Sequence, residues 1–580
     1  MAVTEGQRRG ACRLAWAGAL GCVLLMAPPV AAREPQIDPR QSEKVFDTYM
    51  QQQKRRATRP EVPQLGAGAA AVQDRKPLFK LTSVSIRGAT AIASEDLAAA
   101  YRPYLGRTVS QADLAEMTNR ITDLYRGAGY SLSRALIPPQ DIQGGRIHIK
   151  VVEGEIADVV LKGDGAAHFG IRPLLDPLTQ ERPARQASLE RRLLLASDIP
   201  GIRIADTALE ELGAGSGKFR LIVFVESWRV FTSMSLDNRG TPAVGPLQGY
   251  FATAFNSLLL GSDTLAVNLS TIPDATQENG YSRVLYDMPL GLNGARLSAS
   301  VSYGEVWPND ETRATNTNTA TTIAALKATF VAWRSRESSL WLGIGAAWSD
   351  VVQENDSGTK YNDHVRSVAL SGDYQSQDRF GGFTYFSAAV THGADILGAS
   401  QKDDALLSRE DGSGQFWKLN AALTRYQKLT EAWSLNVSAI AQAASTALLA
   451  SEEFYLGGLM FGRGYNSGEL SGDSGLAASA ELRFDQETKL GLLKGYQLYG
   501  FLDGGRVWDL GSGGTSLSST GGGIRLFFPE QLQAGIEVAV PLTYRSSTNP
   551  DRDPRTFFFV AKSFKFCPEK AWARCAHVDR

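Results

Sequence analysis

The sequence has few of the residues on which most enzymes and metal sites depend. Its 580 residues include 5 histidines and 4 cysteines, and neither an H-E-x-x-H nor a G-x-S-x-G motif occurs. Basic and acidic residues balance at 60 and 61, whereas a nucleic-acid-binding surface needs an excess of positive charge. After the first thirty residues, no apolar run approaches the ~20 residues of a membrane-spanning helix. We therefore expect no catalytic site, no metal or other cofactor, and no nucleic-acid partner.

Two short stretches are similar to known motifs but lack the full pattern. Gly213–Lys218 (GAGSGK) is similar to a phosphate-binding loop, yet a glycine is missing at the required spacing and Phe219 stands where Ser or Thr is needed. Because it joins two predicted strands, we interpret it as a hairpin turn. Gly472–Gly475 (GDSG) is similar to the surroundings of the serine in trypsin-like proteases, but no histidine in that fold's order accompanies it. Neither stretch is assigned a catalytic role.

Residues 1–32 have the pattern of a secretory signal peptide. Three arginines precede an apolar core at Leu14–Met26, and the small-residue site Val30–Ala32 follows it. A lipoprotein signal at Cys22 is the alternative, but Ala19–Gly21 match such a signal poorly and the apolar run continues past the cysteine. We expect cleavage after Ala32.

Cleavage at that position would leave two cysteines, both in a short tail at residues 567–580. Cys567 and Cys575 could form a local disulfide in an oxidising compartment. A metal site would need more ligands than His577 supplies.

Residues 33–77 form a polar segment rich in proline, glycine and alanine, with one predicted helix at about 42–56. Within it, Val45, Phe46, Tyr49 and Met50 make a short apolar stripe at helical spacing. The plain description is a helix followed by a flexible linker.

Residues 78–228 contain the same order of elements twice. In 78–154, an alternating strand is followed by two helices, the second at Gln111–Gly127, and by two closing strands. In 155–228, a strand is again followed by two helices, the second at Ser188–Ala196, and by two strands. A β-α-α-β-β unit used twice is an internal repeat. Each unit is long enough to fold as one sheet covered by two helices.

From residue 229 to residue 566, helical periodicity gives way to alternating strands. In Leu532–Leu542 (LQAGIEVAVPL) and in Leu340–Trp348, every second residue is apolar, which indicates strands with one apolar face. About sixteen such strands can be counted, each of roughly ten residues, the length of tilted membrane strands.

The connections between these strands alternate in length. Short ones such as Gly291–Gly294 and Pro529–Gln531 alternate with long ones such as Val351–His364 and Ala447–Ser474. Short turns on one side and long loops on the other are typical of a bacterial outer-membrane barrel. A soluble sandwich would also alternate, but its loops would not sort in this way. The pattern predicts a transmembrane barrel at 229–566.

One long connection carries an arginine between two glycines, in the order Gly462, Arg463, Gly464, Tyr465. Glycine lets a backbone bend sharply and approach another surface closely. Arginine offers a planar, permanently charged fork that suits carboxylates. A solvated glycine-rich surface loop is the alternative interpretation.

The two strands after this loop place carboxylates inside the predicted barrel. A charge on the lipid face costs about 2–4 kcal/mol near the midplane, so Glu481, which alternates with apolar neighbours, must face the lumen. By the same parity Phe501, Asp503 and Gly505 face inward from the next strand. An inward-folded Arg463 would reach Glu481 and Asp503 and form charge-assisted pairs. A lumen network unrelated to the loop is the alternative.

Taken together, these features resemble the TpsB transporters of two-partner secretion, which belong to the superfamily of POTRA-plus-barrel translocases and insertases. The most specific marks are the motif Arg463-Gly464-Tyr465 and the aromatic-x-Asp-x-Gly strand motif at Phe501, Asp503 and Gly505. The resemblance covers nearly the whole mature chain. One departure is that the family tends to end on an aromatic residue, whereas here the last predicted strand is followed by the tail at 567–580.

The resemblance implies two α+β POTRA domains followed by a C-terminal 16-stranded antiparallel transmembrane β-barrel. It places the barrel in the bacterial outer membrane and the POTRA domains in the periplasm. It further implies that the loop arginine contacts the strand aspartate inside the lumen, and that the N-terminal helix plugs the pore. The POTRA domains would bind a hemolysin- or hemagglutinin-like exoprotein partner; outer-membrane lipid and the barrel-assembly machinery would be the other partners.

Three other functions are weighed against secretion. A barrel-assembly insertase of the same superfamily usually carries more POTRA domains. A passive porin would not need POTRA domains at all. An enzyme is the weakest alternative, because nucleophile, base and metal ligands are all missing from the sequence.

Overall fold

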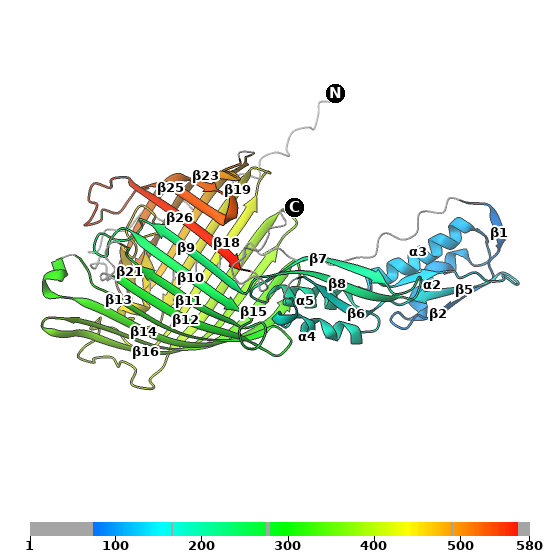
Figure 1. Ribbon diagram of the computed structural model, residues 1–580, viewed down its shortest axis with the longest axis horizontal. Helices are drawn as coiled ribbons and strands as arrows, with labels where there is room; N and C mark the ends of the chain where they lie inside the picture. The colour runs from blue at the N-terminus through cyan, green and yellow to red at the C-terminus, as the bar shows by residue number, and fades with distance from the viewer. Residues whose placement is uncertain (1–73, 164–165, 274–278, 310, 489–490, 567–580) are drawn as a thin grey trace, which may run out of the picture.

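The molecule consists of a barrel of tilted strands and an arm of two α/β units that extends from one end of it (Figure 1). The computed structural model describes residues 74–163, 166–273, 279–309, 311–488 and 491–566. The expected signal peptide, the helix predicted at about 42–56 and the tail at 567–580 lie outside the described residues.

The first unit of the arm is a three-stranded sheet covered by two helices. Its elements are β1 (Pro77–Lys80), β2 (Ser83–Arg87), α2 (Ser94–Tyr101), η1 (Arg102–Tyr104), β3 (Thr108–Ser110), α3 (Gln111–Gly127), β4 (Arg134–Leu136) and β5 (Arg146–Val152). The central β5 pairs with β2 in parallel and with β4 antiparallel. Helix α3 begins with a capping box between Ser110 and Asp113, and its Met117, Ile121 and Tyr125 join the core over β5. The short β1–β3 pair was not predicted, because three or four residues show no period.

The second unit repeats this arrangement. Its elements are β6 (Glu155–Lys162), η2 (Ala166–Phe169), α4 (Ile171–Leu175), η3 (Asp176–Gln180), α5 (Gln186–Ser197), β7 (Ile202–Glu211) and β8 (Lys218–Ser227). Strand β8 lies between β6, which is parallel to it, and β7, which is antiparallel. The sheet order matches that of the first unit, so the internal repeat is confirmed. Gly213–Gly217 form the turn between β7 and β8, as predicted for the GAGSGK stretch.

The rest of the described chain is a closed barrel of sixteen strands in which every neighbouring pair is antiparallel. The barrel closes where the first strand, β9, pairs with the last, β26, from Phe559 opposite Asp237 to Phe566 opposite Val230. The strands are β9 (Val230–Asp237), β10 (Gln248–Asn256), β11 (Thr264–Thr271), β12 (Asn279–Leu290), β13 (Ala295–Val306), β14 (Asn318–Arg334), β15 (Ser338–Asn355), β16 (Gly358–Gln377), β17 (Gly382–Gly393), β18 (Phe416–Lys428), β19 (Trp433–Ala444), β22 (Ser474–Glu487), β23 (Gly495–Trp508), β24 (Gly514–Phe527), β25 (Leu532–Pro541) and β26 (Arg555–Phe566).

The two faces of the barrel wall differ as the alternation predicts. On β23, Leu498 and Leu502 are exposed outward, whereas Phe501 and Asp503 between and beside them are buried inside. Apolar side chains facing out and polar ones facing in are expected where the outer surface meets lipid. None of the helices in the described part of the chain is long and apolar enough to cross a membrane.

Two expectations about the strands need correction. Strands β14, β15 and β16 have 17, 18 and 20 residues, not roughly ten. The long loop expected at Val351–His364 is a tight turn, because β15 runs to Asn355 and β16 begins at Gly358. The polar residues that suggested a loop continue the ladder, because β14 and β16 both pair with β15 in this extension, and both of its faces can meet water.

The second unit of the arm docks on the turns at the near end of the barrel. Arg334, at the end of β14, forms a bidentate pair with Asp198, with nitrogen–oxygen distances of 2.7 and 2.8 Å. Arg192 of α5 donates to the carbonyl of Leu292 in the β12–β13 turn at 2.7 Å. Because these contacts join different parts of the chain, they fix the arm against one side of the barrel rim (Figure 1).

Candidate functional site in the barrel lumen

The long loop between β19 and β22 turns back into the barrel. Its stem is a short hairpin of β20 (Phe454–Leu456) and β21 (Leu470–Gly472). The loop has an apolar core of its own that packs on the inner wall; its members are Phe454, Leu456, Phe461, Tyr465, Leu470, Ala477, Val507 and Leu517. A glycine-rich surface loop in solvent is therefore excluded.

Arg463, at the tip of this loop, is buried among carboxylates of the wall. Its Nη1 lies 2.7 Å from Glu481 of β22 and 3.2 Å from Glu537 of β25. Its Nε lies 3.1 Å from Asp503 of β23; this contact is ionic, since the N–H does not point at the oxygen. Nη2 donates to Ser479 at 3.2 Å. The predicted partners Glu481 and Asp503 thus do meet the arginine.

The backbone of the motif is held as firmly as its side chain. The amides of Gly462 and Arg463 both donate to Asp503 Oδ1, at 3.0 and 3.3 Å. Gly464 N donates to Ser519 at 3.1 Å, and Ser519 donates to the same Asp503 oxygen. Asp503 therefore anchors the loop directly through two of its amides, indirectly through Ser519 and Gly464, and through charge.

The two glycines beside the arginine are required by this close approach. Gly462 has φ +80°, a left-handed conformation, and an added Cβ would lie 2.5 Å from Leu517. A Cβ on Gly464 would lie 2.8 Å from the backbone nitrogen of Pro541. On the wall, a Cβ on Gly505 would lie 2.9 Å from Leu456 of the loop. The motif's glycines therefore leave room for loop against wall.

Tyr465 closes the site on the other side. Its hydroxyl donates to the carbonyl of Tyr544 at 3.1 Å and accepts from the amide of the same residue at 3.0 Å. Tyr544 belongs to the loop between β25 and β26, so the tyrosine joins two loops. All eight residues predicted from sequence lie on the loop or on the wall that faces it.

Several residues of the site were not predicted. Glu537 joins Arg463 to Arg239, which lies 2.8 Å from the other oxygen of Glu537 and two residues after the end of β9. Arg525 and Arg483 both pair with Glu481, at 2.9 and 2.7 Å. Glu537 could have been found, because it is the charged residue on the inward face of LQAGIEVAVPL; Arg239 carried no signal, because only barrel closure brings it near.

Three of these arginines also lie on inward-facing aromatic rings. Arg463 is centred 3.8 Å from the ring of Phe501, Arg525 lies 3.7 Å from Tyr499, and Arg239 lies 4.3 Å from Phe557. The rings of Phe501 and Tyr499 have space because the neighbouring strand β24 carries glycines. A Cβ on Gly521 or Gly523 would lie 2.7 Å from Phe501 or 2.6 Å from Tyr499, respectively.

The cluster thus holds four arginines against three carboxylates in a shielded lumen. Charges removed from water interact more strongly than on a surface, and an unpaired one is correspondingly costly. Removing Arg463 would leave Asp503, Glu481 and Glu537 facing one another with less compensation. The arrangement contains no nucleophile–base pair, and what it can do is hold a loop.

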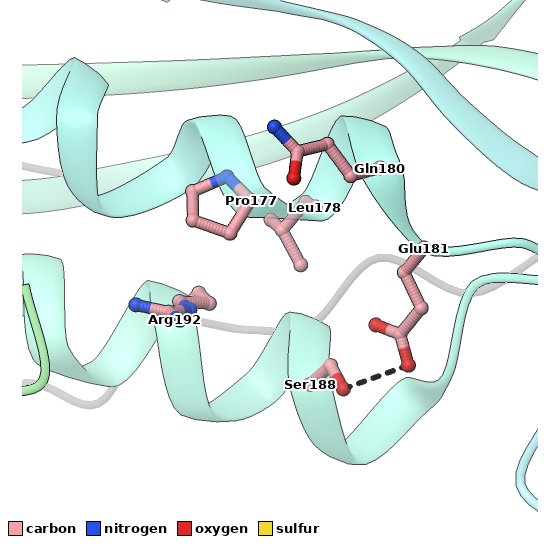
Figure 2. Close-up of a pocket in the computed structure, with 6 residues that line it drawn as sticks. All are labelled: Pro177, Leu178, Gln180, Glu181, Ser188 and Arg192. Carbon is pink, nitrogen blue, oxygen red and sulfur yellow. Dashed lines mark hydrogen bonds between the residues drawn. The ribbon is translucent and has the colours of Figure 1, made fainter.

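Two other places could be considered functional sites. A cleft of about 300 Å³ lies between η3 and α5, lined by Pro177, Leu178, Gln180, Glu181, Ser188 and Arg192 (Figure 2). Within it Ser188 donates to Glu181 at 3.0 Å, while Arg192 is bound to the barrel turn. Ser188, Glu181 and Arg192 are therefore already engaged by the fold.

The second place is an acidic cluster above the barrel, where oxygens of Glu453, Asp473 and Asp509 lie within 4.8 Å of one another. Such spacing could hold a metal ion. The guanidinium of Arg409 already bonds to Glu453 at 2.6 Å and to Asp473 at 2.5 Å, and Asp411 lies 3.1 Å from it. The cation of this cluster is an arginine.

A closed sixteen-stranded barrel, two POTRA-type units and a lumen-bound loop arginine define an outer-membrane transporter of the POTRA-plus-barrel class. The chain belongs to the family described as haemolysin secretion/activation protein ShlB/FhaC/HecB, whose model matches residues 222–526. Residues 79–154 match the ShlB-type POTRA domain. It is a two-partner secretion transporter that secretes an exoprotein across the outer membrane, with its POTRA domains in the periplasm.

Relatives support this assignment over most of the chain. The heme/hemopexin transporter protein HuxB of Haemophilus influenzae is 24% identical over 510 residues, covering 80% of this chain and 84% of HuxB. The outer membrane transporter CdiB of Dickeya dadantii is 23% identical over 494 residues, covering 82% and 85%. The solved structure of CdiB from Escherichia coli has the same fold, with a TM-score of 0.70, 19% identity and coverage of 91% and 98%.

Proposed function

We propose that the Arg463 cluster holds the loop in the conformation that a secreted polypeptide needs to pass through the lumen. The observation that carries this proposal is the convergence of three carboxylates, from three different strands, on one loop guanidinium. A loop tied in this way cannot drift across the pore without separating buried charges. Transport and loop position are therefore linked through one side chain.

The exported chain is captured by the arm. In each POTRA sheet the middle strand is paired on both sides, whereas the two outer strands each have one unpaired edge. These outer strands are β2 and β4 in the first domain and β6 and β7 in the second. An edge strand offers unpaired backbone groups to an extended peptide, which adds as a further strand. The partner is a hemolysin- or hemagglutinin-like exoprotein whose N-terminal secretion domain makes this contact.

We assign the remaining parts as follows. Residues 1–32 are the signal peptide, 33–77 the plug helix and linker, 78–154 and 155–228 the POTRA domains, 229–566 the barrel and 567–580 a tail. Outer-membrane lipid surrounds the barrel, and the barrel-assembly machinery inserts it. The protein is a transporter without enzymatic activity and has no nucleic-acid partner.

The test is Arg463→Ala in cells that also express the exoprotein partner. Secretion into the medium should collapse while the barrel is still found, folded, in the outer membrane. Arg379→Ala is the matched control, since that arginine is exposed in the short β16–β17 turn. Normal secretion by Arg463→Ala would remove the role we assign.

The plug is tested separately by conductance. Deleting residues 42–56 should increase the conductance of the purified protein in planar bilayers if that helix occupies the pore. Unchanged conductance would support an open porin-like channel instead.

A further inference from the structure

Three consecutive leucines are exposed at the end of the barrel that contacts the POTRA arm. Leu258, Leu259 and Leu260, in the turn between β10 and β11, are 49%, 73% and 63% exposed. Isolated exposed leucines are normal on protein surfaces, but three in succession in one turn are not explained by chance exposure.

The turn that carries them is held rigidly by a buried acid. Asp263 is fully buried, and its carboxylate accepts from the amides of Leu258 at 2.8 Å and Leu259 at 2.9 Å. The hydroxyl of Tyr286 donates to the same carboxylate at 2.8 Å. The leucine backbone is therefore folded over Asp263 in one conformation.

Parity shows which side of the wall this is. Asp263 has the same parity as Leu269, which faces outward from β11, and Tyr286 has that of Val284, which faces outward from β12. The turn thus folds over the outer, lipid-facing surface of the wall and not into the lumen. The three leucines continue the apolar outer surface of the barrel at the end that contacts the arm.

The opposite side of the same turn contacts the POTRA arm. The hydroxyl of Ser262 donates to the carbonyl of Phe169 at 2.6 Å, and that of Ser257 donates to the carbonyl of His168 at 2.5 Å. Gly261 packs against Gly170, where an added Cβ would lie 3.5 Å from the Gly170 nitrogen. One turn therefore presents serines to the second POTRA domain and leucines away from it.

We propose that Leu258, Leu259 and Leu260 form a foot that is inserted among the acyl chains of the periplasmic leaflet of the outer membrane. The foot extends the lipid-facing wall of the barrel at the periplasmic end. The acid of this turn, Asp263, is buried beneath it and places no charge among the acyl chains. Through Ser257 and Ser262 the inserted foot sets the position of the second POTRA domain against the membrane surface. This inference rests on the outer-membrane location of the barrel and not on the role of Arg463.

The experiment measures the depth of spin labels in proteoliposomes of phosphatidylethanolamine and phosphatidylglycerol. The four native cysteines are replaced by serine, and single cysteines are introduced as Leu259→Cys or Leu260→Cys in the full chain. Collision with oxygen is compared with collision with a water-soluble nickel complex. Leu269→Cys on the lipid-facing wall and Leu78→Cys, exposed in the first POTRA domain, are the membrane and water controls.

Labels at Leu259→Cys and Leu260→Cys should favour oxygen over nickel, as at Leu269→Cys, with Leu78→Cys giving the opposite order. Both sites are highly exposed, so neither substitution disturbs packing. Nickel-favoured collision at both sites would overturn the proposal, as would protection from both reagents, which would mean that protein covers the leucines. Adding Asp263→Ala should shift the Leu259→Cys label toward nickel, because the turn loses its backbone acceptor; an unchanged depth would contradict the part assigned to Asp263.

Discussion

Two of the buried arginines in the described chain, Arg463 and Arg409, each contact several carboxylates, but in different parts of the molecule. Arg463 meets carboxylates carried by three strands of the barrel wall. Arg409, in the β17–β18 loop, meets Glu453 and Asp473, which flank the β20–β21 stem of the loop that carries Arg463. Both side chains are nearly inaccessible to solvent. The first cluster therefore ties the tip of this loop to a rigid wall inside the pore, and the second ties its base to the β17–β18 loop. The same ion chemistry thus joins loop to wall in one place and loop to loop in the other.

The largest expected effect follows from removing the wall-bound cation. Arg463→Met should lower the stability of the folded barrel by about 3–5 kcal/mol, because three buried carboxylates lose their shared partner. The measurement is the temperature at which the purified barrel loses its compact mobility on a gel in detergent. Arg379→Met, which changes an exposed arginine, should leave that temperature unchanged. An equal midpoint for both variants would show that the cluster is not what stabilises the loop.

Arg409→Met should separate the two clusters by function. It leaves Glu453 and Asp473 buried without a cation, at a cost of about 3 kcal/mol or more, but the tip of the lumen loop stays tied to the wall through Arg463. Protease added to intact cells should cleave within residues 394–415 faster than in the parent protein, while secretion continues. A loss of secretion as complete as that of Arg463→Ala would abolish the distinction drawn between the clusters.

Glu537→Gln tests how far the wall cluster extends. Glu537 joins Arg463 to Arg239, so the change weakens its hydrogen bonds to two charged groups. A hydrogen bond to a charged group contributes about 1.5–3 kcal/mol to stability. The double variant with Arg463→Met should lose less stability than the sum of the losses in the two single variants, because the residues share partners. Full additivity in the melting temperatures would mean that Arg239 is held independently of the loop.

The smallest effect concerns a carboxylate that has no part in either arginine cluster. Burial opposes the ionisation of Glu153 in the first POTRA domain, yet hydrogen bonds from Thr90, Tyr125 and the amide of Ala91 outweigh it and hold its pKa below the ordinary value. A lowered pKa contributes stability above the ordinary glutamate pKa, and this contribution is lost as the pH falls through the lowered value.

Glu153→Gln should therefore lower the urea midpoint of the POTRA region at neutral pH, and the gap to the parent protein should close in acid. The midpoint is followed by circular dichroism of the full chain in detergent over a pH series. A gap that stays constant down to pH 3 would show that ionisation of Glu153 is not what the domain depends on.

The sequence was informative wherever a regular period or a glycine reported the local structure. The β-α-α-β-β repeat followed from helical and strand periods, and the inward face of Glu481 and Asp503 followed from parity in strands whose other face is apolar. The glycines around Arg463 indicated close backbone approach before any partner was known. These are short-range signals, and they located both halves of the main contact.

The remaining parts of the site depend on contacts that no local pattern reports. Arg239 meets Glu537 across 298 positions, and only because the first strand closes on the last. The Arg409 cluster joins irregular loops, in which side-chain direction has no period. The prediction of a loop at 351–364 was wrong for a related reason. Beyond the membrane, a polar sequence does not distinguish a loop from strands that are exposed to water on both faces.

The junction between arm and barrel also determines the direction from which cargo arrives. The contacts of the second POTRA domain fall on the β10–β11 turn, on Leu292 of the next turn and on Arg334 of the one after. These are consecutive turns on one arc of the rim. The arm therefore contacts one side of the barrel end. A chain captured by the arm, as we propose, therefore reaches the pore from the side of these turns.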